Sequence, residues 1–129
     1  DESYVDKKRS GYHGNNCAEI HEMHEDYLRP QENGSHTDCD YLILKGTDLT
    51  FATAGEKTFS FNASPYTQEE LTTKKHSYEL QPCGSTVLCL DYAQNGIGSN
   101  SCGPELRKEY QFTEETFTFD MKFLFGKEW

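Results

Sequence analysis

The feature that most constrains the fold is a strict two-residue alternation near the end of the sequence. Over residues 116–123 every second side chain is apolar, and the residues between them are Thr, Asp or Lys. The apolar positions are Phe117, Phe119, Met121 and Phe123. Successive side chains of a β-strand point to opposite faces, so this period predicts a strand with one buried and one solvated face. Such one-sided burial is typical of antiparallel sheets.

Other apolar runs predict further strands. The clear runs cover residues 41–44, 58–61 and 86–92. Weaker strand candidates lie at residues 3–6, 19–28 and 76–80. Turn residues such as Asn33-Gly34, Gly46 and Gly84 stand between the runs. We therefore expect about seven or eight strands, a number that suits an antiparallel β-sandwich.

Only one segment carries a convincing helix signal. Thr67, with Glu70 three residues later, has the pattern of a capping box, in which the two side chains bond to each other's backbone N–H groups. We expect one short helix near 67–72 in an otherwise all-β fold. The 129 residues suffice for one domain, 1–129, and no second domain. Because the chain opens on strand-like sequence without a start signal, we expect it to be the later part of a larger sandwich.

The charge of the chain restricts its partners. The net charge is −10 at pH 7, which disfavours nucleic acid and anionic membranes because polyanions repel one another. No apolar run approaches the roughly 18 residues of a membrane span. We therefore expect no nucleic-acid partner and no membrane association, and a neutral or cationic partner instead.

Five cysteines occur at irregular spacings: Cys17, Cys39, Cys83, Cys89 and Cys102. The sequence has no C-x-x-C pair, so neither a zinc knuckle nor a redox pair is indicated. Because the number is odd, one thiol must stay unpaired. We favour free cysteines in a reducing compartment and a cytoplasmic location over a disulfide framework. The N-x-S sequons at Asn33 and Asn62 are then chance matches.

Two sequence patterns approach known ligand motifs without completing them. His21 and His24 lie near an H-E-x-x-H zinc pattern, but their spacing is one residue short. On the expected strand they would point to opposite faces, so we interpret them as surface or half-buried histidines and predict no metal site. In 96–103 the third glycine of a dinucleotide loop would fall at Ser101, so we interpret these glycines as backbone bends.

No catalytic constellation is identified. Cys102 could serve as a nucleophile only if the fold placed a histidine beside it, which the sequence does not show. Carboxylate pairs occur at Glu69-Glu70, Glu114-Glu115 and Glu25-Asp26, but each pair is adjacent in a charged stretch. Glycosidases need two carboxyls facing each other about 5 to 9.5 Å apart. We therefore predict no catalytic residue in this chain.

Three ordered segments carry more information. They cover residues 27–38, 59–80 and 90–104. In this order they resemble the C-terminal domain of the large multi-domain beta-galactosidases of glycoside hydrolase family 2, and the resemblance covers nearly the whole chain. Its strongest parts are Pro30-Gln31-Glu32-Asn33-Gly34 and Gly96-Ile97-Gly98 through Pro104.

The resemblance implies a fold, an activity and partners. The fold would be an antiparallel supersandwich similar to galactose mutarotase, of which this chain is the later portion. The parent would hydrolyse terminal β-D-galactosides such as lactose with retention, using two glutamates in a central (β/α)8 barrel that has no counterpart here. We expect no cofactor in this chain, and Mg and Na ions bound in other domains of the parent. Expected partners are those domains, the galactoside in the parent's active site and a homo-oligomer.

The resemblance also implies a substrate-pocket edge formed by residues 98–103. There Asn100 and Ser101 would offer hydrogen bonds to sugar hydroxyls. Cys102 stands where some family members have a tryptophan whose indole faces the sugar. Because a thiol has little surface to stack on a ring, Cys102 should contribute less binding than an aromatic side chain. The alternative is that this loop only packs against the barrel.

Two functions from other classes remain open. One is an autonomous carbohydrate-binding sandwich with Tyr66 or Tyr92 as the stacking platform, which would bind galactose directly. The other is a pure oligomerisation module, which would self-associate without responding to sugar. Mutarotase activity is not expected, because fold likeness does not transfer function and no motif matches the required acid and base.

Overall fold

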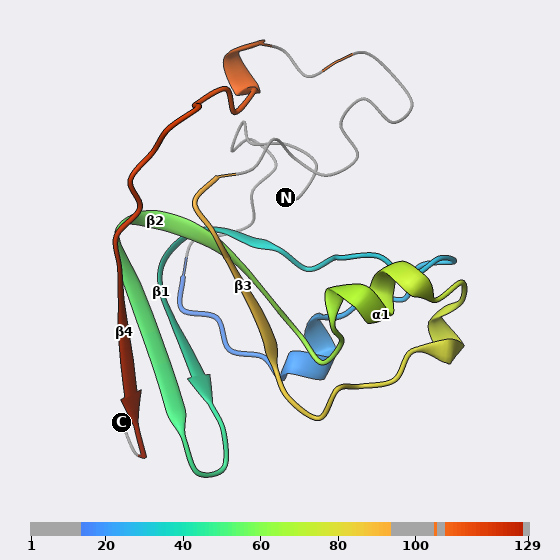
Figure 1. Cartoon of the computed structure of the whole chain (residues 1–129). Coiled ribbons are helices and arrows are strands. Elements are labelled where there is room, and N and C mark those ends of the chain that lie inside the picture. The colour runs from blue at the N-terminus through green and yellow to red at the C-terminus, as the bar shows by residue number, and fades with distance from the viewer. Residues whose placement is uncertain (1–13, 94–104, 106–107, 128–129) are drawn as a thin grey trace.

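The computed structural model describes residues 14–93, 105 and 108–127, and all structural statements refer to these residues. They form one antiparallel sheet of four strands: β1 (His36–Lys45), β2 (Thr50–Ser64), β3 (Val87–Asp91) and β4 (Met121–Gly126) (Figure 1). The helical elements are short: η1 (Ile20–Met23), α1 (Gln68–Thr73), η2 (Ser77–Glu79) and η3 (Lys108–Tyr110). The expected all-β class is confirmed. Within the described ranges, however, the strands number four and form a single sheet, fewer than the seven or eight expected.

The long strand β2 organises the sheet. One edge of β2 pairs with β1, from Thr50 to Phe61, and the first half of the other edge, from Thr50 to Gly55, pairs with β4. Its second half pairs with β3, from Ser60 to Ser64. Because β1 occupies one edge, β3 and β4 share the other edge of β2, one after the other along its length.

The strand expected at 116–123 begins later than the alternation predicts. β4 starts at Met121, opposite Gly55, and β3 occupies the same edge of β2 from Ser60 onward. Residues 56–59 of β2 lie between these two paired stretches, and the Glu56 N–H donates to the Asp120 carbonyl at 3.4 Å. Phe117 and Phe119 instead contact the ring of Tyr92, at centroid distances of 4.4 and 5.4 Å. The alternation therefore predicted side chains that cluster. It did not predict where the backbone joins the sheet.

Two of the weaker strand predictions are wrong, because helical turns η1 and η2 lie in those segments. In each turn a glutamate folds back onto the backbone three residues earlier. Glu22 accepts the Glu19 N–H at 3.1 Å, and Glu79 accepts the His76 N–H at 2.9 Å. These local bonds stabilise a turn in preference to an extended strand. The third weak candidate, residues 3–6, lies outside the described residues.

The short helix expected near 67–72 is confirmed as α1. Thr67 has extended backbone angles, and its hydroxyl accepts the Glu70 N–H at 3.1 Å, as an N-cap does. The Glu70 carboxylate accepts the Gln81 N–H at 2.9 Å and lies 3.7 Å from the Lys74 ammonium. The second half of the expected capping box thus serves to attach the following segment to the helix.

The buried apolar core is small. Its members are Leu42, Phe59, Ala63, Leu71 and Leu80, each no more than 8% exposed. No described helix is long and apolar enough to cross a membrane.

One half of the sheet is apolar on both faces. We call residues 41–45 of β1, 50–55 of β2 and β4 the open sheet. One of its faces carries the cross-strand rows Leu42–Thr53–Phe123 and Leu44–Phe51–Phe125. The other face carries Ile43–Ala52–Leu124 and Tyr41–Ala54–Lys122.

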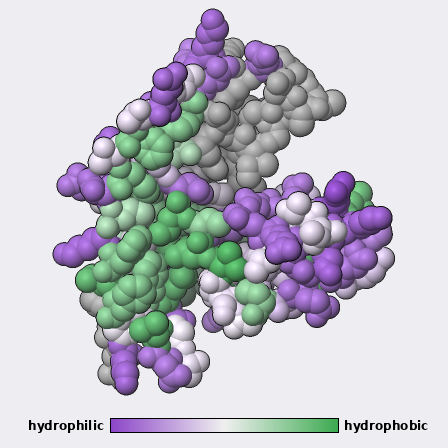
Figure 2. Space-filling model, in the orientation of Figure 1, coloured by the Kyte–Doolittle hydropathy of each residue, from purple (hydrophilic) through white to green (hydrophobic). Residues whose placement is uncertain are grey.

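Leu42 is buried, but several large apolar side chains of the open sheet are exposed on both faces. Phe123 and Phe125 are 52% and 65% exposed on one face, and Tyr41 and Ile43 are 53% and 45% exposed on the other. Figure 2 shows hydrophobic residues gathered over the strands and hydrophilic residues around α1. Strands that are apolar on both faces are typical of sheets covered on both sides, so the open sheet has the composition of an inner layer.

Candidate functional site

The residues that the sequence assigns to the pocket edge, Asn100, Ser101 and Cys102, lie outside the described residues. Their geometry is therefore not part of the site described here. Strand β3 precedes their segment in sequence and ends at Asp91, one of several polar side chains that surround a pocket. The site can be built from the elements that position those side chains.

Asn33, in the Pro30-Gln31-Glu32-Asn33-Gly34 motif, holds one wall of this pocket. Its side chain is buried, accepts the Glu25 N–H at 2.9 Å and donates to the carbonyls of Glu25 and Gln31, each at 3.1 Å. Asn62 of β2 donates its side-chain N–H to the Asn33 carbonyl. These bonds fix the segment before β1 against the centre of the sheet.

Gly34 allows this wall to approach closely. Its φ of +73° lies in the left-handed region, and an added Cβ would stand 2.5 Å from the Met23 carbonyl oxygen. Only glycine accommodates both the backbone angle and the close contact at low cost. The sequence predicts a turn at Asn33-Gly34, and the same pair is therefore also a point of close backbone packing.

The pocket lies between this segment, β2, β3 and α1. Its volume is about 90 Å³. Besides Asn33, its lining is polar: Glu32, Ser35, Asn62, Gln68, Cys89 and Asp91. A wider and shallower hollow of about 400 Å³ adjoins it, shares Glu32 and Gln68, and extends to Arg29 and Leu71.

Negative charge dominates the smaller pocket. Burial raises the pKa of Asp91 above its usual value, because the carboxylate loses hydration. Burial also raises the pKa of the Cys89 thiol, and the nearby Glu32 and Asp91 carboxylates raise it further. Cys89 thus favours the thiol form, which is a poor nucleophile and a poor metal ligand.

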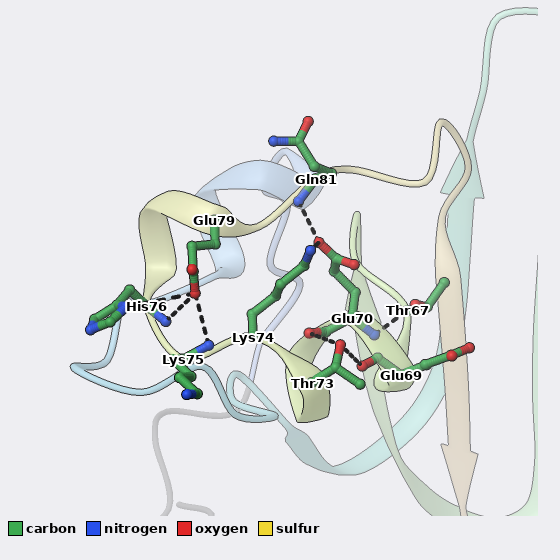
Figure 3. A network of polar contacts seen from close by, with 9 residues as sticks. All are labelled: Thr67, Glu69, Glu70, Thr73, Lys74, Lys75, His76, Glu79 and Gln81. Atoms are coloured by element: carbon green, nitrogen blue, oxygen red, sulfur yellow. Dashed lines mark hydrogen bonds and ion pairs between the residues drawn. The ribbon is translucent and has the colours of Figure 1, made fainter.

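The helix α1 that carries Gln68 is held by the polar network in Figure 3. Thr67 caps its start, and Glu70 ties it to Gln81 and Lys74. In the next turn the Lys75 and His76 N–H groups donate to Glu79, and these bonds lower the pKa of the Glu79 carboxyl. We call residues 19–35 and 65–83 the loop lobe, because their backbone is held by such local bonds.

The two histidines of the incomplete zinc pattern lie in different environments. His21 is exposed in η1. His24 is half-buried, with Nδ1 3.3 Å from Asn33 Nδ2, Nε2 3.6 Å from Asp26 and its ring edge-on to Tyr66 at 5.0 Å. Across the described ranges no group of three His, Cys, Asp or Glu side chains is placed to hold a metal ion.

One carboxylate of each adjacent pair makes a structural contact. Glu70 bonds to Gln81, and its neighbour Glu69 is exposed. Glu114 accepts the Tyr92 hydroxyl at 3.3 Å. Asp26 faces His24. These contacts give the charged stretches a structural role and indicate no catalytic one.

The two tyrosines of the carbohydrate-binding alternative are engaged by neighbouring groups. Tyr92 stacks on Phe117 with an interplanar angle of 8°, and the Lys57 ammonium lies 5.9 Å from its ring centroid. Tyr66 meets His24 edge-on. A stacked tyrosine offers a sugar only its second face, so the geometry around Tyr92 does not favour a broad open platform.

Among the described cysteines, Cys17, Cys39, Cys83 and Cys89 are all free thiols. Burial and the neighbouring carboxylates of Asp38 and Asp40 raise the pKa of Cys39. The fifth, Cys102, lies outside the described residues.

Sequence reasoning missed the acidic pocket. Its residues come from four separate segments, so no local pattern indicates it. The available signal was Asp91, a single carboxylate inside the apolar run Val87–Asp91. A charged residue at a strand position between apolar neighbours is rarely placed there for packing alone.

Comparison with known proteins shows similarity to parts of beta-galactosidases. A family profile described as "Beta galactosidase small chain" matches residues 1–124. The chain is 51% identical to a beta-galactosidase of Actinobacillus pleuropneumoniae over 126 residues, covering 98% of this chain. It is 37% identical to one of Staphylococcus xylosus over 124 residues and 35% identical to one of Kluyveromyces lactis over 128 residues, covering 95% and 96% of this chain.

These relatives are much longer than the chain. In each of the three the match spans 12% of the relative's own length. The sequence described here therefore corresponds to a small part of each of those proteins.

Proposed function

The chain belongs to the beta-galactosidase small chain family, and on that premise we propose that it is the later part of the C-terminal domain of a glycoside hydrolase family 2 beta-galactosidase. Its role is architectural: it completes one wall of the active-site pocket and packs against the remaining domains. The observation that carries this proposal is the match of nearly the whole chain to 12% of each beta-galactosidase.

The open sheet supports a larger parent fold. It exposes apolar side chains on both faces, including Phe125 at 65% and Tyr41 at 53%. Burying apolar surface yields about 25 cal/mol per Å², so both faces gain from coverage by further layers. A supersandwich similar to galactose mutarotase would supply these layers from the preceding part of the domain.

The chemistry of the parent would take place elsewhere. In a retaining glycosidase one carboxylic acid protonates the leaving oxygen, and a second carboxylate attacks the sugar. We place both glutamates, with the Mg and Na ions, in other domains of a cytoplasmic enzyme, and propose that this chain alone is inactive. Among the described residues, no three-ligand group is placed to hold a metal ion.

The loop at 98–103 would provide this chain's contribution to substrate binding. Asn100 and Ser101 would hydrogen-bond to hydroxyls of a galactoside such as lactose, and Cys102 would stand at the pocket edge where some relatives have tryptophan. A Cys102→Trp substitution in the parent should change apparent affinity for sugar or acceptor more than the chemical step. A large loss of turnover at unchanged affinity would contradict this role.

Complementation tests the proposal directly. The 129-residue chain is mixed with the parent enzyme truncated before Asp1, and hydrolysis of a chromogenic β-galactoside is followed, with each piece alone as control. We expect activity only in the mixture. Activity of this chain alone would place catalytic carboxylates within it. An inactive mixture of folded pieces, with galactose binding by the chain, would favour the carbohydrate-binding module, and sugar-independent self-association would favour the oligomerisation module.

A further inference from the structure

We propose that the pocket between Glu32 and Asp91 receives a basic side chain, a lysine ammonium or an arginine guanidinium, from the part of the parent enzyme outside these 129 residues. The inference rests on the proposed function for the existence of that larger chain. It names a docking point that is separate from the open sheet.

The described lining gives the pocket a negative charge. Two carboxylates line it, and its lining includes no Lys, Arg or His among the described residues. Within the same ranges no hydrogen bond or ion pair reaches the carboxylate of Glu32 or Asp91; Arg29 lines only the adjoining hollow. Glu32 is exposed, but Asp91 is half-buried. A carboxylate partly removed from water without a partner is costly, and a cation beside it lowers that cost.

The hydrogen-bonding groups select a ligand with several donors. The side-chain nitrogen of Asn62 donates to the Asn33 carbonyl, and that of Gln68 donates to Cys89 Sγ at 3.3 Å. The amide oxygens remain as acceptors beside the two carboxylates. An ammonium brings three N–H donors and a guanidinium five. An anion would be repelled, and a neutral hydroxyl would leave the charge uncompensated.

The size of the pocket fits a side-chain head. Its volume of about 90 Å³ equals that of roughly three water molecules. Pockets for small molecules commonly begin at about 300 Å³, so a whole sugar ring is too large. The described residues also lack a three-ligand arrangement for a metal ion. An ammonium or guanidinium is therefore the occupant that matches charge, donors and volume together.

The remainder of the parent can supply this group. The chain spans only 12% of its relatives, so most of the polypeptide lies outside it. Its own net charge of −10 favours association with basic groups. The pocket would then fix the orientation of this chain on the enzyme, in addition to the apolar contacts of the open sheet.

The test titrates the 129-residue chain into the parent truncated before Asp1 and measures recovered β-galactosidase activity. The variant is Glu32→Gln with Asp91→Asn, and the matched control is Asp48→Asn with Glu69→Gln, two exposed acids outside the pocket. We expect the pocket variant to associate at least about tenfold more weakly, because it leaves a buried cation without its partners. The control should associate like the wild type.

The outcomes separate this inference from the proposed function. Failure of the wild-type chain to associate would contradict the proposed function. Association of wild type, control and pocket variant at equal strength would overturn the pocket inference alone. If adding Mg or Na to an ion-depleted mixture restores wild-type association, and the pocket variant does not respond, the occupant is an inorganic ion and the inference also fails.

A second measurement guards against misfolding of the variant. Because burial raises the pKa of Asp91, its ionised form destabilises the isolated chain above that pKa, and the penalty fades as pH falls through it. Asp91→Asn should therefore leave the urea midpoint of the isolated chain at pH 7 unchanged or higher, while weakening association. A lower midpoint would mean that Asp91 already has a partner within the chain, and would overturn the inference.

Discussion

The loop lobe and the open sheet are stabilised in different ways. In the loop lobe, side chains such as Asn33, Thr67 and Glu79 bond to nearby backbone groups, and Leu71 is buried. In the open sheet the backbone is paired across β1, β2 and β4, but several large side chains remain exposed on both faces. Local polar bonds complete one region, whereas apolar packing from outside the chain must complete the other.

This difference predicts how each region responds to mutation. A change in the loop lobe should alter the stability of the chain itself. A change in the open sheet should alter its association with other surfaces and leave its own stability nearly intact. The predictions below test that contrast, from the largest expected change in unfolding free energy to the smallest.

Leu71→Ala should have the largest effect. Leu71 is 5% exposed on α1, so truncation removes buried apolar surface and leaves a cavity, which costs about 2–5 kcal/mol. Urea unfolding of the 129-residue chain, followed by circular dichroism, measures the change. Leu49→Ala is the matched control, because Leu49 is 52% exposed in the β1–β2 turn. Equal losses for the two variants would show that the loop lobe has no core of its own.

Asn33→Ala should follow, at about 2–3 kcal/mol. The substitution leaves the Glu25 N–H and the carbonyls of Glu25 and Gln31 without their partner in a partly buried position. Hydrogen exchange should show faster exchange at the Glu25 amide in particular. Asn16→Ala, which removes one exposed bond to the Gly14 carbonyl, is the control and should stay within about 0.5 kcal/mol of wild type.

The loop lobe also shows which structure could be predicted from local sequence. Thr67 and Glu70 marked the helix start, because a cap is formed by residues three positions apart. At Glu19–Glu22 and His76–Glu79 a glutamate likewise bonds to the backbone three residues earlier and stabilises a turn. The composition of these two segments predicts strands instead. Sequence could thus predict elements whose stabilising contacts lie within one helical turn.

The rest depended on contacts between distant segments. β4 begins at Met121, and the preceding Phe117 and Phe119 pack on Tyr92, a contact that nothing within residues 116–123 reports. The acidic pocket joins Glu32, Gln68 and Asp91 from three elements that pair or pack only in the folded chain. The predicted pocket-edge residues Asn100, Ser101 and Cys102 lie outside the described structure and stay predictions.

Thr67→Ala should cost about 1 kcal/mol, the usual value of an N-cap hydroxyl. The variant leaves the Glu70 N–H without its acceptor, while the contacts of Glu70 with Gln81 and Lys74 remain. Urea unfolding again measures the loss, and Thr67→Ser should recover most of it because serine retains the hydroxyl. If serine were as unfavourable as alanine, the threonine methyl group and not the cap would be responsible.

The smallest change in stability should come from the open sheet, in the double variant Phe123→Ser with Phe125→Ser. Both rings contact Phe51, but they are 52% and 65% exposed, so the isolated chain loses only part of their packing, about 1 kcal/mol or less. Self-association and binding to the truncated parent should instead fall sharply, because exposed apolar area drives both. Analytical ultracentrifugation and the complementation titration measure them.

Tyr78→Ser removes an 81% exposed aromatic from the loop lobe and is the matched control. If Tyr78→Ser weakened association as much as the double variant, exposed hydrophobicity anywhere on the chain would suffice, and the open sheet would lose its special role as the covered inner layer.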